Sequence, residues 1–251
     1  AGQLPNSIIL EPNTEPFTGY YSSEHAWQEG STFQTHAGTK VKIADVAAGS
    51  AKVTITAPGP QTPVDPFKDV NSDTQFQQAI LWAYNNNITN GYDDGTFRPY
   101  ESINRDAMAA FLYRLAGEPR FTPPSTSPFV DYGTGDKFYK EITWLKKAGI
   151  TDGWKVGENE YEYRALEPIN RDAMAAFLYR MAGEPAYNPP STSPFTDYPT
   201  SAKFYKEVAW LEEMNITEGW KVGENEYEYR ALEPINRDAM VAFLWRFDKQ
   251  F

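Results

Sequence analysis

The sequence predicts a mainly α fold of three tandem helix-loop-helix repeats, preceded by a small β domain. The first observation is an internal repeat: the string INRDAMAAFLYR begins at Ile103 and Ile169, and returns with two changes at Ile235. The second is that apolar residues recur around each copy with the spacing of an amphipathic helix. The third is that short alternating stretches, typical of strands, are found in residues 1–60. A long internal repeat indicates that one supersecondary unit is used several times.

We interpret residues 1–60 as the small β domain. KVKIADV and AKVTITA alternate apolar and polar residues, and SIIL, TGYY and TFQTH are shorter strand candidates separated by turn residues. The truncated end of a larger sandwich is one interpretation of this region. Its histidines, His25 and His36, have no third ligand nearby in sequence, so we expect surface or core residues rather than a metal pair.

The repeats are expected at residues 64–119, 126–185 and 192–251. Residues 153–174 and 219–240 are identical at 22 successive positions, so the second and third repeats should share one local structure. Pro-rich segments join the repeats, with PPSTSPF starting at Pro123 and again at Pro189. Such segments favour stiff, extended linkers.

Each repeat should begin with an amphipathic helix. In the second repeat, Phe138, Ile142 and Leu145 fall at i, i+4 and i+7 of one apolar stripe. The helix should end at a residue that tolerates a left-handed backbone, which is Asn87, Gly149 or Asn215 in the three repeats. One tryptophan per repeat lies at the edge of the stripe and is expected to pack between repeats: Trp82, Trp144 and Trp210.

A second amphipathic helix closes each repeat, and its apolar face should form the shared core. An asparagine precedes this helix as the expected N-cap, at Asn104, Asn170 and Asn236. An aspartate follows in the first turn, where the helix dipole favours negative charge. The expected core residues are Met108, Phe111 and Leu112 with their copies Met174, Phe177, Leu178, Met240, Phe243 and Leu244.

Composition limits the classes of function. The 34 acidic residues outnumber the 23 basic ones, and this charge of −11 argues against a nucleic-acid partner. The absence of cysteine excludes thiolate chemistry, and no apolar run approaches the roughly 20 residues of a membrane span. Common catalytic motifs are missing and neither histidine lies in the repeats, so we predict no enzyme, cofactor or metal site. A two-carboxylate glycan hydrolase is the least favoured alternative.

An arginine opens the second helix of every repeat, at Arg105, Arg171 and Arg237. Free backbone N–H groups, the positive helix end and a guanidinium would converge there, which suits a carboxylate or phosphate ligand. The alternative is a solvated ion pair with the following aspartate or with a nearby glutamate. The nearby glutamates are Glu101, Glu167 and Glu233.

Two further features leave alternatives open. The aromatic residues that follow a turn glycine, Tyr92, Trp154 and Trp220, can line a groove or pack inside the protein. The GENEYEYR segments are rich in carboxylates but lack the spacing of a calcium loop, so we favour solvated acidic hairpins.

The order of motifs in each repeat resembles the S-layer homology domain. Residues 67–69 (FKD) match the family's F-x-D opening, residues 91–92 its G-[YW] turn, and residues 94–99 its D-G-x-F-x-P element. The resemblance covers about residues 64–251, and three tandem units are usual in the family. The family's T-R-A-E reads Asn-Arg-Asp-Ala here, which puts a carboxylate next to the arginine.

The resemblance implies a pseudo-threefold prism whose grooves between repeats bind an anionic secondary cell-wall polysaccharide. It therefore implies noncovalent, extracellular anchoring of a secreted protein to the wall of a Gram-positive cell. A protein–protein or self-assembly module is the alternative. Carried over by position, the ligand-binding residues are the three arginines Arg105, Arg171 and Arg237, the aspartates Asp69, Asp131 and Asp197, the glycines Gly91, Gly153 and Gly219, and the aromatic residues Tyr92, Trp154 and Trp220.

Overall fold

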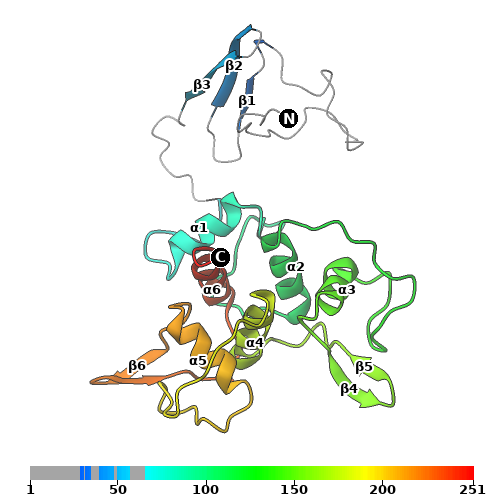
Figure 1. Cartoon of the computed structure of the whole chain (residues 1–251), viewed down its shortest axis with the longest axis vertical. Coiled ribbons are helices and arrows are strands. Elements are labelled where there is room, and N and C mark those ends of the chain that lie inside the picture. The colour runs from blue at the N-terminus through cyan, green and yellow to red at the C-terminus, as the bar shows by residue number, and fades with distance from the viewer. Residues whose placement is uncertain (1–28, 31, 35–39, 48–49, 57–65) are drawn as a thin grey trace, which may run out of the picture. The chain divides into compact units, whose positions relative to one another are not determined.

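The computed structural model describes residues 29–30, 32–34, 40–47, 50–56 and 66–251 (Figure 1). The chain divides into two units, Ala1–Val64 and Asp65–Phe251. The predicted strands SIIL and TGYY and both histidines lie outside the described residues.

The described part of the first unit is a three-stranded antiparallel sheet. It consists of β1 (Thr32–Gln34), β2 (Lys40–Ala47) and β3 (Ser50–Thr56), in the order β1-β2-β3. The alternation in KVKIADV turns Val41 and Ile43 to the buried side, whereas Val53 and Ile55 of β3 are exposed. The strands predicted from KVKIADV and AKVTITA are therefore confirmed.

The second unit combines short helices with two hairpins and long loops. The hairpins are β4 (Trp154–Gly157) with β5 (Glu160–Glu162), and β6 (Trp220–Gly223) with β7 (Glu226–Glu228). Across the described residues there are six helices: α1 (Gln77–Asn85), α2 (Arg105–Leu115), α3 (Tyr139–Lys147), α4 (Arg171–Met181), α5 (Tyr205–Glu213) and α6 (Arg237–Asp248).

The helices pair across repeats rather than within them. The first helix of each repeat packs on the second helix of the preceding repeat, giving the pairs α2 with α3 and α4 with α5. The last pair joins the two ends of the unit, since α1 packs on α6 (Figure 1). The sequence repeat is therefore not the packing unit, and the chain closes on itself.

Backbone hydrogen bonds link the three repeats in a cycle. Ile103 N–H donates to the carbonyl of Ile235 (3.0 Å), Ile169 N–H to that of Ile103 (3.1 Å), and Ile235 N–H to that of Ile169 (2.9 Å). All three isoleucines are buried, so these bonds are shielded from water. Each repeat donates to one neighbour and accepts from the other.

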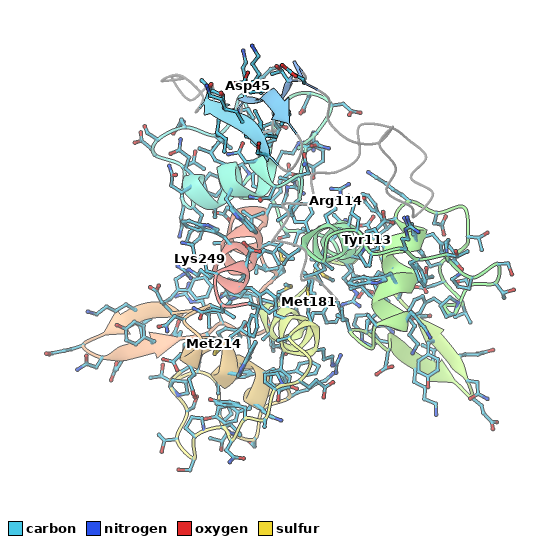
Figure 2. The ribbon with its side chains drawn as sticks, turned by 45° about the horizontal axis from the view of Figure 1, so that its top comes forward. Asp45, Tyr113, Arg114, Met181, Met214 and Lys249 are labelled. Atoms are coloured by element: carbon cyan, nitrogen blue, oxygen red, sulfur yellow. The ribbon has the colours of Figure 1, made fainter. Side chains whose placement is uncertain are left out.

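The predicted core is confirmed. The residues at the three apolar positions of α2, Met108, Phe111 and Leu112, are buried in one continuous cluster together with all six of their copies. Tyr113 of α2, which is labelled in Figure 2, meets Trp144 of α3 edge to face, with ring centroids 5.2 Å apart. Tyr179 and Trp210 repeat this contact at 5.2 Å. Trp82 also packs against the cluster, so the packing role expected of the three stripe-edge tryptophans is confirmed.

The ends of the first helices agree with the sequence, whereas their starts do not. Asn87, Gly149 and Asn215 all have a left-handed backbone, as expected. Phe138 was expected inside a helix, but it is the left-handed residue just before α3, and its side chain is half-buried. Its copies Phe76 and Phe204 have the same backbone conformation. Phe138 and Phe76 still pack against the core cluster as partly buried residues.

Candidate ligand-binding grooves

The second unit contains two equivalent grooves where three repeats meet. The α2 groove has a volume of about 600 Å³. The turn Thr89–Tyr92 and α2 come from the first repeat, Lys137 and Phe138 from the second, and Arg237 from the third. The α6 groove, of about 420 Å³, is built in the same cyclic way. Its main lining residues are Phe76, Arg171, Trp220, Asp238 and Arg246.

The turn glycines are required by the backbone. Gly91, Gly153 and Gly219 have φ angles of 71°, 77° and 71°. A Cβ at Gly153 would lie 2.5 Å from the carbonyl oxygen of Glu162, and one at Gly219 2.6 Å from that of Glu228. No side chain fits there, so these glycines place the following aromatic residue at the groove rather than contributing side-chain contacts.

Each of those aromatic rings is in contact with two guanidinium groups. The Trp154 ring centroid lies 4.1 Å from the Arg105 guanidinium carbon and 4.9 Å from that of Arg164. Trp220 has the same relation to Arg171 (4.1 Å) and Arg230 (4.8 Å). Tyr92 completes the set with Arg237 at 4.8 Å and Arg98 at 3.8 Å. Cation–π attraction holds these rings in place, and each remains partly exposed.

The arginines at the helix starts are buried and connect neighbouring repeats. Arg105 Nε donates to the carbonyl of Tyr163 (2.9 Å), Arg171 Nε to that of Tyr229 (3.0 Å), and Arg237 Nε to that of Phe97 (2.7 Å). Burial lowers the pKa of all three below the ordinary value for arginine. Arg171 and Arg237 also line the α6 and α2 grooves, so they combine a structural role with a position in the groove wall.

The helix starts do not offer the free N–H groups that the sequence led us to expect. The N–H of Arg105 donates to Glu167 (3.0 Å) and that of Asp106 to Ala165 (3.0 Å), both backbone carbonyls of the next repeat. The third N–H, of Ala107, donates to Asp106 Oδ1 (2.6 Å). The other two helices repeat this pattern. The asparagines occupy the N-cap positions without side-chain capping, because neighbouring backbone has replaced them.

The ion-pair alternative for these arginines does not hold either. Within the described part of the chain, the arginines that form ion pairs are others: Arg98, Arg164, Arg230 and Arg246. Any anion that reaches Arg171 or Arg237 would therefore meet a guanidinium without a carboxylate partner.

The opening aspartates hold the loop that precedes each second helix. Asp131 accepts the N–H groups of Tyr163 and Arg164 on its two carboxylate oxygens, each at 2.7 Å. Asp197 binds Tyr229 and Arg230 in the same way (2.7 and 2.8 Å), as Asp69 binds Phe97 and Arg98 (2.8 and 2.7 Å). The second residue that each aspartate binds has a positive φ; it is Arg98, Arg164 or Arg230. The two hydrogen bonds from the aspartate stabilise this backbone conformation.

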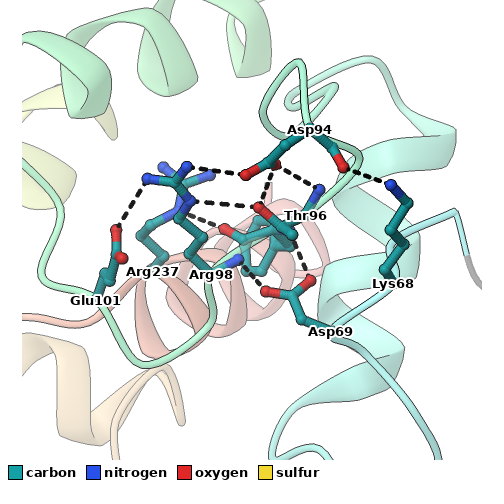
Figure 3. Close-up of polar contacts among 8 residues, drawn as sticks. Lys68, Asp69, Asp94, Thr96, Arg98, Glu101 and Arg237 are labelled. Carbon is teal, nitrogen blue, oxygen red and sulfur yellow. Dashed lines mark hydrogen bonds and ion pairs between the residues drawn. The ribbon is translucent and has the colours of Figure 1, made fainter.

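The loop of the first repeat adds a polar network (Figure 3). Asp94 accepts bonds from the N–H and hydroxyl of Thr96 (3.0 and 2.6 Å) and pairs with Arg98 (3.0 Å). These bonds lower the pKa of Asp94 to about 2. Hairpins replace this network in the other repeats, where Glu162 pairs with Arg164 (3.0 Å). The acidic segments thus form hairpins, and the described residues include no group of side chains suited to hold a metal.

These motifs agree with a comparison against protein families. Residues 66–109 and 194–239 match the S-layer homology domain. The chain is also 27% identical over 168 residues to a cellulosome-anchoring protein of Acetivibrio thermocellus. This alignment covers 64% of the chain and 35% of the relative, so it spans about a third of the relative's length. In the described residues no helix is long and apolar enough to cross a membrane.

Sequence reasoning missed one set of three arginines, two of which line these grooves. Arg114, Arg180 and Arg246 end the repeated string, and each donates Nη1 to the carbonyl of Ile88, Ile150 or Ile216 (2.9–3.1 Å). Arg114 and Arg246 line the α2 and α6 grooves. Their threefold recurrence at the end of an apolar stripe was the signal available in the sequence.

A buried carboxylate stands beside the helix-start arginine in every repeat. Burial raises the pKa of Asp106, Asp172 and Asp238 above the ordinary value. Lys137 offsets the effect at Asp106, and Lys203 does so at Asp172. Near Asp238 the position equivalent to Lys137 is occupied by Gln75, which carries no charge. The pKa of Asp238 rises to about 6.

Proposed function

We propose that this chain is a noncovalent cell-surface anchoring module that binds an anionic cell-wall polysaccharide in grooves between its repeats. The observation that carries the proposal is the α2 groove. Arg114, Lys137 and Arg237 line it against two carboxylates, Glu101 and Asp106. In a protein of net charge −11, such a local excess of cations selects an anionic ligand.

The shape and lining of the groove favour a sugar polymer over a small anion. A volume of about 600 Å³ exceeds what a lone carboxylate or phosphate would fill. Tyr92 and Phe138 add aromatic surface to the guanidinium and ammonium groups. Aromatic rings beside polar groups are suited to sugar rings, which carry apolar faces and hydroxyl edges.

We infer that the three repeats form the pseudo-threefold prism expected from the family resemblance. The cyclic bonds of Ile103, Ile169 and Ile235 support this arrangement, as does the pairing of α1 with α6. The middle repeat lies outside the matched segments, yet residues 153–174 are identical to residues 219–240, nearly all of which lie in one of those segments. Three S-layer homology units in one closed array are therefore the proposed architecture.

The proposed role is extracellular, wall-associated and noncatalytic. The name of the Acetivibrio relative supports anchoring as the task of the region that the two chains share. Sites that hold a polymer need several weak contacts rather than a reacting group, and grooves on one closed array would raise the avidity for a repeating ligand.

Retention on purified Gram-positive cell walls tests the proposal. The chain should pellet with intact walls and stay in solution after the secondary polymer has been extracted. Lys137→Gln should reduce retention, because it removes a groove cation. Glutamine is the residue that the first repeat has at the equivalent position, Gln75, so the fold should accept it. Lys140→Gln is the matched control, since Lys140 is exposed on α3 but is not part of the groove lining. Equal retention on extracted walls would overturn the proposal.

Self-association is the second candidate function. Both hairpins carry an exposed valine, Val156 (45% exposed) and Val222 (47%), in identical sequence surroundings. With two exposed valines in identical surroundings, one chain could contact a further copy through each hairpin. Sedimentation over a range of protein concentrations, without any glycan, should show assembly if this function holds; a constant monomer mass contradicts it.

A further inference from the structure

A second hollow lies next to the α2 groove, on the side of the β4–β5 hairpin. It has a volume of about 900 Å³, and we name it the hairpin hollow. Its lining includes Asp106, Tyr132, Lys137, Arg164, Leu166 and Glu167. An equivalent hollow of about 820 Å³ lies beside β6–β7, with Asp172, Tyr198, Lys203, Arg230, Leu232 and Glu233 at the matching positions.

The hairpin hollow adjoins the α2 groove. Asp106 and Lys137 line both of them, so a ligand that leaves the groove past these two side chains enters the hollow. A polymer chain is the kind of ligand that can occupy both at once.

Most polar groups of the hairpin hollow are already committed within the protein. Asp131 bonds two backbone N–H groups, and Arg164 pairs with Glu162 at 3.0 Å. The hydroxyl of Tyr132 donates to the carbonyl of Lys137. These groups shape the hollow and have little capacity left for a ligand.

Asp106 and Lys137, which line both the hollow and the α2 groove, have bonding capacity left. Asp106 is only 9% exposed, and within the described residues its carboxylate has no ion-pair partner; its hydrogen bond to the N–H of Ala107 uses one oxygen. The Lys137 ammonium lies 4.7 Å from the Phe138 ring centroid and likewise forms no ion pair. A buried carboxylate oxygen and an ammonium group therefore lie at the junction of the hairpin hollow and the α2 groove, and both can accept or donate further hydrogen bonds.

The chemistry of the hairpin hollow differs from that of the α2 groove. Its carboxylates, Asp106, Asp131, Asp136, Glu162 and Glu167, outnumber its two cations, so a negatively charged group is disfavoured there. Leu166, 76% exposed, gives the hollow an apolar wall. An uncharged sugar could place its ring on Leu166 and direct hydroxyl groups to Asp106 and Lys137.

We propose that the hairpin hollow is a second sugar subsite, which takes an uncharged, hydroxyl-bearing residue of the polymer whose anionic residue occupies the α2 groove. This inference rests on the proposed function and adds the order of sugars that the protein recognises. Asp106 and Lys137 stand between the subsites and contact both residues. The hollow beside β6–β7, with Asp172 and Lys203 at the matching positions, has the same lining chemistry and would take the same kind of sugar.

Fragment length tests the proposal. Polysaccharide released from a wall preparation that retains the protein is cleaved, separated by size, and titrated calorimetrically into the whole chain. Affinity should rise between fragments that fill one subsite and those that fill two. The double change Leu166→Asp with Leu232→Asp should weaken binding of the longer fragments about fivefold and leave the shortest unchanged. Both leucines are exposed, so the fold should tolerate the change.

The control is Val156→Asp with Val222→Asp, which adds the same charges at exposed positions outside the lining of both hollows. Affinity that does not depend on length, or long fragments that bind the leucine variant as well as wild type, would overturn the second subsite while leaving the proposed function intact. If no fragment binds at all, the proposed function fails and the subsite fails with it.

Discussion

The α2 and α6 grooves have the same scaffold and opposite charge. Three cations face two carboxylates in the α2 groove, whereas Arg171 and Arg246 face Glu218, Glu233 and Asp238 in the α6 groove. Two positions explain the difference: Gln75 replaces Lys137, and Glu218 replaces Asn90. Repeats that share their core to near identity can therefore present binding sites of different character, because the lining residues come from three repeats and vary independently.

The largest effect should come from a change that both grooves share. Gly91→Ala and Gly219→Ala each put a Cβ at a positive φ and against backbone, 2.5 Å from the carbonyl oxygen of Thr96 or 2.6 Å from that of Glu228. We expect each to lower the free energy of unfolding by about 3 kcal/mol, measured by denaturant titration. Gly117→Ala is the control, with φ 77° but open space around the Cβ, and should cost about 1 kcal/mol. Equal losses for all three would show that sterics at the turn are unimportant.

The next largest effect concerns Asp238 of the α6 groove and is measured as the free energy of unfolding. Asp238→Asn keeps the acceptor for the N–H of Ala239 and removes a charge whose side chain is buried without a nearby lysine. Because the folded pKa is about 6 and lies above the unfolded value, the folded state holds more protons between about pH 4 and pH 6, and wild-type stability falls as pH rises through that window. The variant should gain about 2 kcal/mol at pH 7 and lose most of this pH dependence in thermal unfolding.

Asp106→Asn and Asp172→Asn are matched controls for that prediction. Lys137 and Lys203 offset the burial of these two carboxylates, so the gain at pH 7 should be smaller. A gain as large as that of Asp238→Asn would mean that Gln75 does not distinguish the α6 groove.

Part of this comparison could be predicted from the sequence. Helical periodicity identified Met108, Phe111 and Leu112 as core, because the stripe of one amphipathic helix is a local property. The recurrence of Gly91, Gly153 and Gly219 after an apolar helix marked the turns that position the groove aromatics. Such features depend on a few successive residues, so the spacing of residues in the sequence is enough to predict them.

The rest depended on contacts between distant repeats. Arg105 bonds the carbonyl of Tyr163 and Arg237 that of Phe97, so a residue that looked like a free anion site became a link between repeats. The pairing of α1 with α6 has no local signature, because the two helices lie at opposite ends of the unit. The role of Lys137 in the α2 groove was missed for the same reason, since it precedes a helix of a different repeat.

A reciprocal exchange tests whether the charge difference decides ligand affinity. Lys137→Gln should weaken binding of the anionic polysaccharide to the α2 groove about tenfold, and Gln75→Lys should strengthen binding to the α6 groove by a similar factor. Calorimetry would give both affinities, and the effect of each change should shrink as salt is raised from about 50 to 500 mM. If both single variants bind like wild type at low salt, the lysine position has no influence on the ligand.

The smallest predicted effect concerns Glu218. Its carboxylate pairs with Arg246 at 3.4 Å and occupies one face of a cation that the α2 groove leaves without such a partner, because Asn90 stands at the matching position. Glu218→Asn should release Arg246 to the ligand and raise α6-groove affinity about threefold, while changing stability by less than about 1 kcal/mol since the pair is largely solvated. The reverse change, Asn90→Glu, should weaken the α2 groove by the same factor in calorimetric titration. Opposite shifts from the two variants would trace the difference between the grooves to single charges, whereas shifts in the same direction would point to the shape of the turn instead.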